Sequence, residues 1–343
     1  MTSEVIYVDK NSGIPLFGID FIGAIDRGTN IIELKPLTLC NLQCRYCFVS
    51  AGDYDSNFIV DSNYLLEKVK RVIKIKGKYD IEIHLAPYGE ILLYPDLFKL
   101  IENLWNVEGV KIISMQTNGL LLSKDKIKKL EAVNLSRINI SLNTLNREMA
   151  DYLCKTNGYN MNKLLKNIQI LLNSNVDLLI APVWFSGKND NDIKDIIEFI
   201  VDLRNNGYSE KQVQIGIQNY LIYKTGRKLK KVGPKTWDYF YKRLTKLEKE
   251  YNIKLKLGPK DFGIHKRNGI DTLKLKKNDV INLKVVSKGR WSRECIGKIN
   301  KEIGIKILLK KPLISNYLVG KEIKAKIIKA NYKDNILTAV YPF

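Results

Sequence analysis

The sequence predicts an α/β protein in which about six strand-and-helix units follow one another, with a small all-β module after them. Short apolar runs recur along residues 30–220, and amphipathic helical stretches separate them. This alternation is typical of a parallel sheet, either an open curved barrel or a doubly wound layer, and periodicity does not separate the two. After about residue 255 the apolar segments become shorter and long helical patterns stop.

The predicted strands of the first part are apolar runs rich in β-branched residues. The fifth run is apolar almost throughout, which indicates burial on both faces. Helices fill the intervals: Leu65, Val69 and Ile73 lie on one helix face, and Asp96 is placed to cap the next helix. The predicted strands are 30–36, 81–86, 110–115, 137–142, 176–183 and 213–218.

The last part of the chain predicts a small antiparallel barrel or sandwich of ~70 residues. Its predicted strands are 273–276, 280–286, 303–309, 322–328 and 336–340, with glycines between them. The stretches 319–327 and 335–339 resemble a TRAM or other OB-like module. That resemblance implies RNA binding, and the alternative is a basic structural cap.

Composition and charge narrow the class of protein. The chain has 343 residues, 45% hydrophobic and 27% charged, which excludes wholesale disorder and low-complexity sequence. No apolar run reaches the ~18 residues of a membrane span, and residues 1–4 do not open a secretory signal. We therefore expect a soluble, cytoplasmic protein with no membrane partner.

The positive charge is concentrated in the last third. Residues 221–343 hold 32 Lys and Arg against 10 Asp and Glu, whereas residues 1–220 hold 25 against 26. A general preference for lysine would raise both parts alike. The asymmetry therefore predicts a polyanionic partner for the basic C-terminal third, with nucleic acid first among such partners.

Three of the five cysteines lie within eight residues, namely Cys40, Cys44 and Cys47. An odd total with three crowded together is a poor disulfide framework. A structural zinc site takes four protein ligands, and His84 and His265 are the only histidines that could complete one. Three thiolates on one short loop fit a cubane iron–sulfur cluster in which one iron lacks a protein ligand.

The spacing Cys-x3-Cys-x2-Cys, with the aromatic Tyr46 before the last cysteine, resembles the signature of the radical S-adenosylmethionine (SAM) superfamily. The resemblance covers roughly residues 30–250. It implies a partial (βα)6 barrel, a [4Fe–4S] cluster on the three cysteines, and SAM bound to the open iron and cleaved to a 5′-deoxyadenosyl radical. It also implies an electron donor such as ferredoxin or flavodoxin, and an adenine contact near Tyr46.

The segment after the second predicted strand is similar to the superfamily's Gly-Gly-Glu-Pro segment, which holds the amino group of SAM. Gly89 and Glu90 match that segment, whereas Tyr88 replaces its first glycine and Ile91 its proline. An ammonium group needs carboxylate and carbonyl acceptors, and a glycine allows close approach of the backbone. The alternative interpretation of Glu90 is a solvated loop acid.

Polar residues also follow the third and fourth predicted strands. The resemblance implies that Gln116 and Asn118 contact the ribose or face the substrate; the alternative is an ordinary turn. Ser141 and Asn143 point the same way from their strand. The resemblance assigns the polar residue of this strand to the ribose hydroxyls, and the alternative is a hydrogen bond to the backbone.

Basic residues follow the sixth predicted strand. Lys224, Arg227 and Lys228 suit a phosphate-bearing substrate, and the alternative is a solvated basic face. Trp184 and Phe185 offer a stacking surface for adenine or are part of the core.

The predicted organisation is an N-terminal extension (1–29), a radical SAM core (30–255) and a basic β domain (270–343). The motifs 26–30, 180–184 and 217–220 resemble an archaeal radical SAM group described as Fe–S oxidoreductases. Cys154 and Cys295 are the only spare thiols, so a second cluster for sulfur insertion cannot be built within this chain. The sequence identifies no residue that acts on the substrate.

Three hypotheses follow. The first is a radical SAM enzyme, an oxidoreductase or transferase, that modifies RNA, with tRNA as the leading substrate. The second keeps the radical chemistry but acts on a small metabolite or a peptide. The third is a non-catalytic RNA-binding protein with a vestigial cluster.

Overall fold

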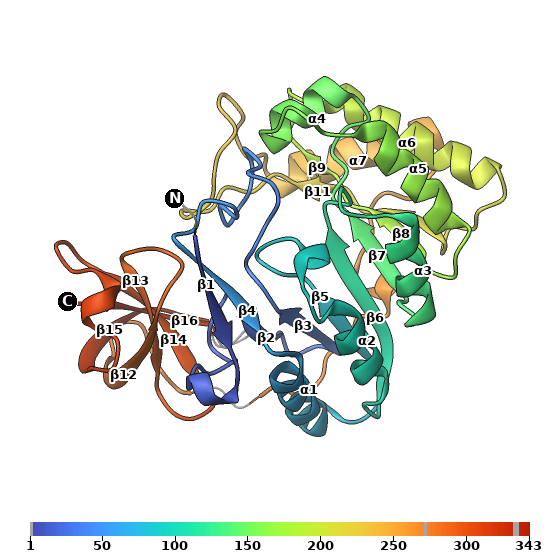
Figure 1. Ribbon diagram of the computed structural model, residues 1–343. Coiled ribbons are helices and arrows are strands. Elements are labelled where there is room, and N and C mark those ends of the chain that lie inside the picture. Colours follow the sequence, from blue (N-terminus) through green and yellow to red (C-terminus); the bar gives the residue numbers. More distant parts are fainter. Residues whose placement is uncertain (1–2, 271–272, 332–335) are drawn as a thin grey trace. The chain divides into compact units, whose positions relative to one another are not determined.

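A computed structural model describes residues 3–270, 273–331 and 336–343 (Figure 1). The contacts within the chain divide it into two compact units. The first unit comprises Met1–Leu39, Asp53–Ile112 and Ile264–Phe343, and the second comprises Cys40–Gly52 and Ile113–Gly263. The units are therefore interleaved along the sequence, and the cysteine segment belongs to the second one. The predicted boundaries 1–29, 30–255 and 270–343 stay a prediction.

In the first unit, β3 (Ile31–Lys35) lies between β2 (Gly23–Asp26), which is antiparallel to it, and β5 (Ile81–Leu85), which is parallel. A separate parallel pair joins β1 (Glu4–Val8) to β4 (Ser56–Val60). Helices α1 (Ser62–Lys76) and α2 (Leu97–Trp105) bury the apolar faces expected from the spacing of their apolar residues. Asp96, which precedes α2, makes no side-chain capping bond. The helical segments here are η1 (Lys10–Ser12), α1 (Ser62–Lys76), η2 (Ile91–Leu93) and α2 (Leu97–Trp105).

The C-terminal part of the first unit is a closed barrel of five strands, in the order β12-β13-β14-β16-β15. All neighbours are antiparallel except β14 and β16, which are parallel. This arrangement fits an OB-like domain and confirms the expected small all-β module. The strands are β12 (Val280–Lys288), β13 (Glu294–Lys298), β14 (Gly304–Leu309), β15 (Glu322–Asn331) and β16 (Ile336–Tyr341), with η3 (Pro259–Phe262) before them and η4 (Ser315–Tyr317) within.

The barrel differs from the sequence prediction at two places. Residues 273–276 form no strand, and the second strand, β13, was not predicted. Gly297 lies within β13, where a Cβ atom would meet the side chain of Leu283 at 2.6 Å. The packed interior therefore requires glycine at this position. Because glycine is unfavourable inside strands, the sequence did not predict β13.

In the second unit, parallel strands follow the order β6-β7-β8-β10, and a short parallel pair joins β9 to β11. The predicted run 176–183 is divided into β8 and β9, because Pro182 between them has no N–H to donate. The strands are β6 (Val110–Thr117, in this unit from Ile113), β7 (Arg137–Ile140), β8 (Asp177–Ile180), β9 (Val183–Trp184), β10 (Val213–Ile215) and β11 (Gln218–Asn219).

The helices of the second unit alternate with its strands, as the sequence predicts. They are α3 (Lys124–Ala132), α4 (Arg147–Cys154), α5 (Met161–Leu172), α6 (Asp190–Asn205) and α7 (Trp237–Tyr251). The predicted α/β class is confirmed. Within the described ranges, none of the helices has both the length and the apolar character that crossing a bilayer requires.

Candidate active site

The cysteine loop, residues 40–52 of the second unit, presents three free thiols. Cys40, Cys44 and Cys47 are half-buried, whereas Cys154 and Cys295 are buried. A turn brings the Cys47 N–H within 3.1 Å of the Cys44 carbonyl, and the Ala51 N–H lies 3.4 Å from the Cys47 Sγ. The three loop thiols are thus the accessible cysteines of the chain, as cluster ligands must be.

The thiols fit a cluster in chemistry, although they do not converge on one point. Among the residues that the structure describes, no three His, Cys, Asp or Glu side chains are grouped to hold a single metal ion. In a cubane cluster each cysteine binds a different iron, so the thiolates surround the cluster and need not meet at one ion. Three thiols on one loop therefore match the ligand types of a four-iron cluster.

The surroundings of two of these thiols favour the neutral form. Two causes raise the pKa of Cys44 well above its ordinary value: the larger is a hydrogen bond with Cys154, and the smaller is burial. Burial raises the pKa of Cys47. Bound iron would stabilise the thiolate forms of these cysteines.

Tyr46 is fixed by the polar residue that follows β7. Asn143 donates from Nδ2 to the Tyr46 hydroxyl at 2.6 Å, and its Oδ1 accepts the Val183 N–H at 2.7 Å. The Tyr46 ring packs against Phe185 with centroids 4.8 Å apart. Phe185 is fully buried, so it is part of the core. The structure thus brings the predicted residues Tyr46 and Asn143 together, with Asn143 as the support.

Two further pairs involve the predicted polar residues. Gln116, inside β6, donates from Nε2 to the Ser141 hydroxyl at 2.7 Å. Asn118 donates from Nδ2 to the Oδ1 of Asn41 at 2.8 Å, and Asn41 directly follows Cys40 in the sequence. Gln116, Asn118 and Ser141 are half-buried, so a ligand can reach them. Asn41 is a contact that sequence analysis missed.

Gly89 and Glu90 belong to the first unit, where they lie against Leu39, the last residue of its first stretch of chain. A Cβ atom on Gly89 would lie 2.0 Å from the Leu39 carbonyl oxygen, and the Glu90 N–H donates to that same oxygen at 2.7 Å. Glycine is therefore required by the chain's own backbone. Glu90 is 1% exposed and its Oε1 accepts the Leu92 N–H at 3.0 Å, so it is not a solvated loop acid.

Tyr88, which replaces a glycine of the superfamily segment, is flanked by two buried cations. The Lys35 ammonium lies 4.4 Å from the centre of its ring and donates to the Ala86 carbonyl at 2.8 Å. The Arg290 guanidinium lies 5.8 Å from the same ring. Sequence analysis singled out neither cation, because only the fold brings residues 35, 88 and 290 together.

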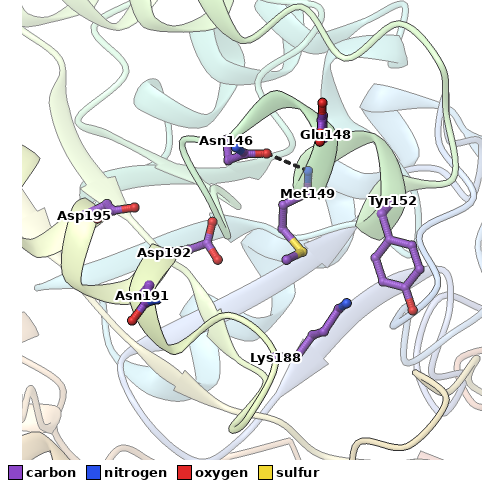
Figure 2. A pocket seen from close by; sticks show the side chains of 8 residues that line it. All are labelled: Asn146, Glu148, Met149, Tyr152, Lys188, Asn191, Asp192 and Asp195. Atoms are coloured by element: carbon purple, nitrogen blue, oxygen red, sulfur yellow. Dashed lines mark hydrogen bonds between the residues drawn. The ribbon is translucent and has the colours of Figure 1, made fainter.

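A pocket of about 420 Å³ lies elsewhere in the second unit (Figure 2). It contains none of the predicted site residues. Asp192, one of its acids, is already hydrogen bonded to Thr144, and Lys188 lies 4.6 Å from the ring centre of Tyr152. The lining residues are Asn146, Glu148, Met149, Tyr152, Lys188, Asn191, Asp192 and Asp195.

Comparisons with known proteins identify the family of this chain. The model of the radical SAM superfamily matches residues 34–200. An uncharacterized protein of Methanocaldococcus jannaschii is 37% identical over 357 residues, covering 98% of this chain and 80% of that protein. The GTP 3′,8-cyclase of Aquifex aeolicus is 29% identical over 180 residues, covering 52% of this chain and 55% of the cyclase.

A solved structure shows the same fold. HydG, a maturase of the [FeFe]-hydrogenase, aligns with a TM-score of 0.53 at 11% identity, covering 74% of this chain and 56% of HydG. At that identity the likeness concerns the fold alone.

This chain belongs to the radical SAM superfamily. It is a radical SAM enzyme, and its cofactors are a [4Fe–4S] cluster and SAM. The chain spans only about half the length of the GTP 3′,8-cyclases that it matches.

Proposed function

We propose that this radical SAM enzyme modifies RNA, with tRNA as its substrate. One observation carries the proposal: the outer face of the closed barrel presents unpaired lysines. Lys284 and Lys324 are exposed and Lys326 is half-buried. Within the described ranges none of the three has a carboxylate partner within ion-pair distance. Oligonucleotides are common ligands of OB-like barrels.

The register of the barrel gathers these lysines on one surface. In the β12–β15 ladder, Lys324 pairs with Asn282 and Lys326 pairs with Val280. Lys284 is the next outward residue of β12 after Asn282, because alternate residues share a face. A phosphate backbone crossing β12 and β15 would therefore meet three cations.

A second basic segment lies in the second unit. Residues 224–235 contain six Lys and Arg and no acid. Next to this segment, the exposed rings of Tyr223 and Phe48 are in contact, with centroids 5.8 Å apart. Phe48 directly follows the cluster ligand Cys47. Exposed rings beside cations suit unpaired nucleotides, whose bases stack on aromatic side chains.

The cofactor roles follow the site geometry. Cys40, Cys44 and Cys47 would hold the cluster, which, once bound and reduced, supplies the electron that splits SAM. Gln116 and Ser141 would receive the ribose hydroxyls. These assignments, together with an adenine contact beside Tyr46 and a ferredoxin or flavodoxin as electron donor, are part of the proposal.

The amino group of SAM would be held by the first unit. Glu90 supplies a buried carboxylate for it, and Gly89 fixes the course of the backbone there. Asn118 would extend the polar rim from Asn41. Asn143 would act through Tyr46, because both ends of its amide are already hydrogen bonded.

The test is tRNA binding over a salt series. The variant Lys284→Gln/Lys324→Gln/Lys326→Gln is expected to bind more weakly and to lower the slope of log affinity against log salt by about two to three. The control replaces three exposed lysines of α1 and α2, namely Lys70, Lys74 and Lys99, and is expected to keep the wild-type slope. A salt-independent affinity, or equal slopes for the two triple variants, would remove RNA from the proposal.

A second candidate is a small phosphorylated substrate, which the similarity to GTP 3′,8-cyclases favours. Formation of 5′-deoxyadenosine by the reduced enzyme, with tRNA or with GTP added, separates the two candidates. Mass spectrometry of tRNA nucleosides from cells with and without the gene then identifies the modification.

A further inference from the structure

The cysteine loop contains no helix or strand between residues 40 and 52, so its course depends on contacts from elsewhere in the second unit. One set of these contacts comes from the segment 225–227, which follows β11. This segment lies in the basic stretch that sequence analysis interprets as a phosphate contact or, alternatively, as a solvated basic face.

Arg227 donates hydrogen bonds to carbonyl groups along the whole loop. Its Nε lies 2.6 Å from the Cys44 carbonyl oxygen, and its Nη2 lies 2.7 Å from the Ala51 carbonyl oxygen. Its backbone N–H donates to the Cys47 carbonyl at 2.8 Å. One residue thereby ties together the backbone at two cluster ligands and at the end of the loop.

The two residues that precede Arg227 also lie close to the cysteine loop. The Ser50 hydroxyl donates to the Thr225 carbonyl at 2.8 Å. At Gly226, a Cβ atom would lie 2.6 Å from the Phe48 carbonyl oxygen. At Gly226 the loop and this segment therefore leave no space for a side chain.

We propose that Arg227 is a positioning residue for the iron–sulfur cluster. The proposal rests on Cys40, Cys44 and Cys47 being the cluster ligands, and it requires no RNA substrate. A planar guanidinium can donate to two carbonyl oxygens at once in a fixed geometry, which a lysine ammonium on a flexible stem cannot reproduce. The guanidinium thus holds the backbone of Cys44 at a set spacing from Ala51, and the Arg227 backbone N–H holds Cys47, as hydrogen-bonding partners of metal ligands commonly do.

The same contacts change the interpretation of the basic segment. The guanidinium of Arg227 is engaged with loop carbonyls, so it supports the cluster loop. The exposed Lys224 and Lys228 on either side of it remain available to phosphate. The basic segment therefore contains both a support of the cluster loop and two exposed lysines.

The experiment measures cluster retention in the absence of RNA. Wild-type and variant proteins are reconstituted anaerobically with iron and sulfide, and the loss of iron to a ferrous chelator is followed. Arg227→Gln is expected to lose iron about 10–100-fold faster than wild type, because that is the usual effect of removing an outer-shell partner. Arg227→Lys is expected to lose iron faster than wild type as well. The matched control Arg147→Gln, at an exposed arginine of α4, is expected to behave as wild type.

Two further measurements keep the test decisive. Thermal unfolding of the cluster-free proteins shows whether Arg227→Gln keeps its fold. Gly226→Ala moves the loop by steric conflict and leaves the arginine in place, so it should also speed iron loss. Wild-type iron retention in Arg227→Gln, or in Gly226→Ala if the first variant does not fold, overturns the proposal. Equal losses in Arg227→Gln and Arg147→Gln overturn it as well.

Discussion

At the scale of single residues, Glu33 shows how burial and charge oppose each other beside the candidate site. Burial by itself would raise the pKa of Glu33, but Lys35 and Arg27 outweigh it and lower the pKa to about 2. Arg27 donates to the Glu33 carboxylate at 2.9 Å, and Lys35 forms an ion pair with it. The same Lys35 lies over Tyr88, so this ion pair supports the segment that carries Glu90.

Glu33 therefore makes the stability of the protein depend on pH. Its folded pKa lies below the ordinary glutamate value of 4.5, so its contribution is fully present above that pH and is lost as the pH falls towards about 2. The contribution is about 3 kcal/mol. We expect Glu33→Gln to make the free energy of unfolding depend less on pH between pH 5 and 2. The measurement is urea unfolding at pH values about one unit apart across this range. A variant whose pH dependence matches wild type would contradict this.

At the scale of elements, the turn between β12 and β13 carries a buried ion pair. Arg290 donates from Nε and Nη2 to the two carboxylate oxygens of Glu294, both at 3.0 Å. The two side chains are 2% and 3% exposed. The guanidinium also lies 4.4 Å from the ring centre of Phe21 and 5.3 Å from that of Tyr54. This turn therefore joins the barrel to the N-terminal part of the same unit.

Removing one partner of this pair should be costly. Glu294→Gln leaves Arg290 charged and buried, and we expect the free energy of unfolding to fall by about 3–5 kcal/mol. The control Glu322→Gln, at an exposed position of β15, should change it by less than about 0.5 kcal/mol. Urea unfolding of both variants provides the measurement. A similar small change in both would show that the pair contributes little.

At the scale of the whole molecule, the first unit consists of three separate stretches of chain. The Gly304 N–H donates to the Phe17 carbonyl at 2.8 Å, and the Leu337 N–H donates to the Gly18 carbonyl at 3.0 Å. Lys306 forms an ion pair with Asp20. The barrel is therefore part of the packing of the N-terminal residues.

Truncation should consequently unfold more than the barrel. Deletion of residues 270–343 removes the barrel groups that contact Asp20, Phe17 and Phe21, so we expect poor solubility, or a melting temperature lower by 10 °C or more (roughly the effect of several kcal/mol). The measurement is thermal unfolding followed by circular dichroism. A truncated protein that melts as wild type would show an independent domain. For this reason the tRNA test uses point variants.

Sequence alone predicted six strand segments of the α/β part and the helices between them, because apolar periodicity is a local property of the chain, but it did not predict β1, β2 or β4. It missed β13, where Gly297 replaces a bulky strand residue, and it extended the fifth strand through Pro182. Its assignment of Gly89 to close approach of the backbone to SAM stays a prediction. In the structure, the group close to Gly89 is the Leu39 carbonyl.

The ligand set of the cluster follows from the sequence without the fold. Three cysteines at a fixed spacing lie on one loop, and the short stretch of chain between them keeps them together in any fold. Only the tertiary structure decided which groups support that loop. Arg227 lies 183 residues after Cys44 along the chain, and no periodic pattern connects them. Such long-range hydrogen bonds depend on how the chain packs, so the role of Arg227 as a loop support, and of Asn143 as the partner of Tyr46, became visible only in three dimensions.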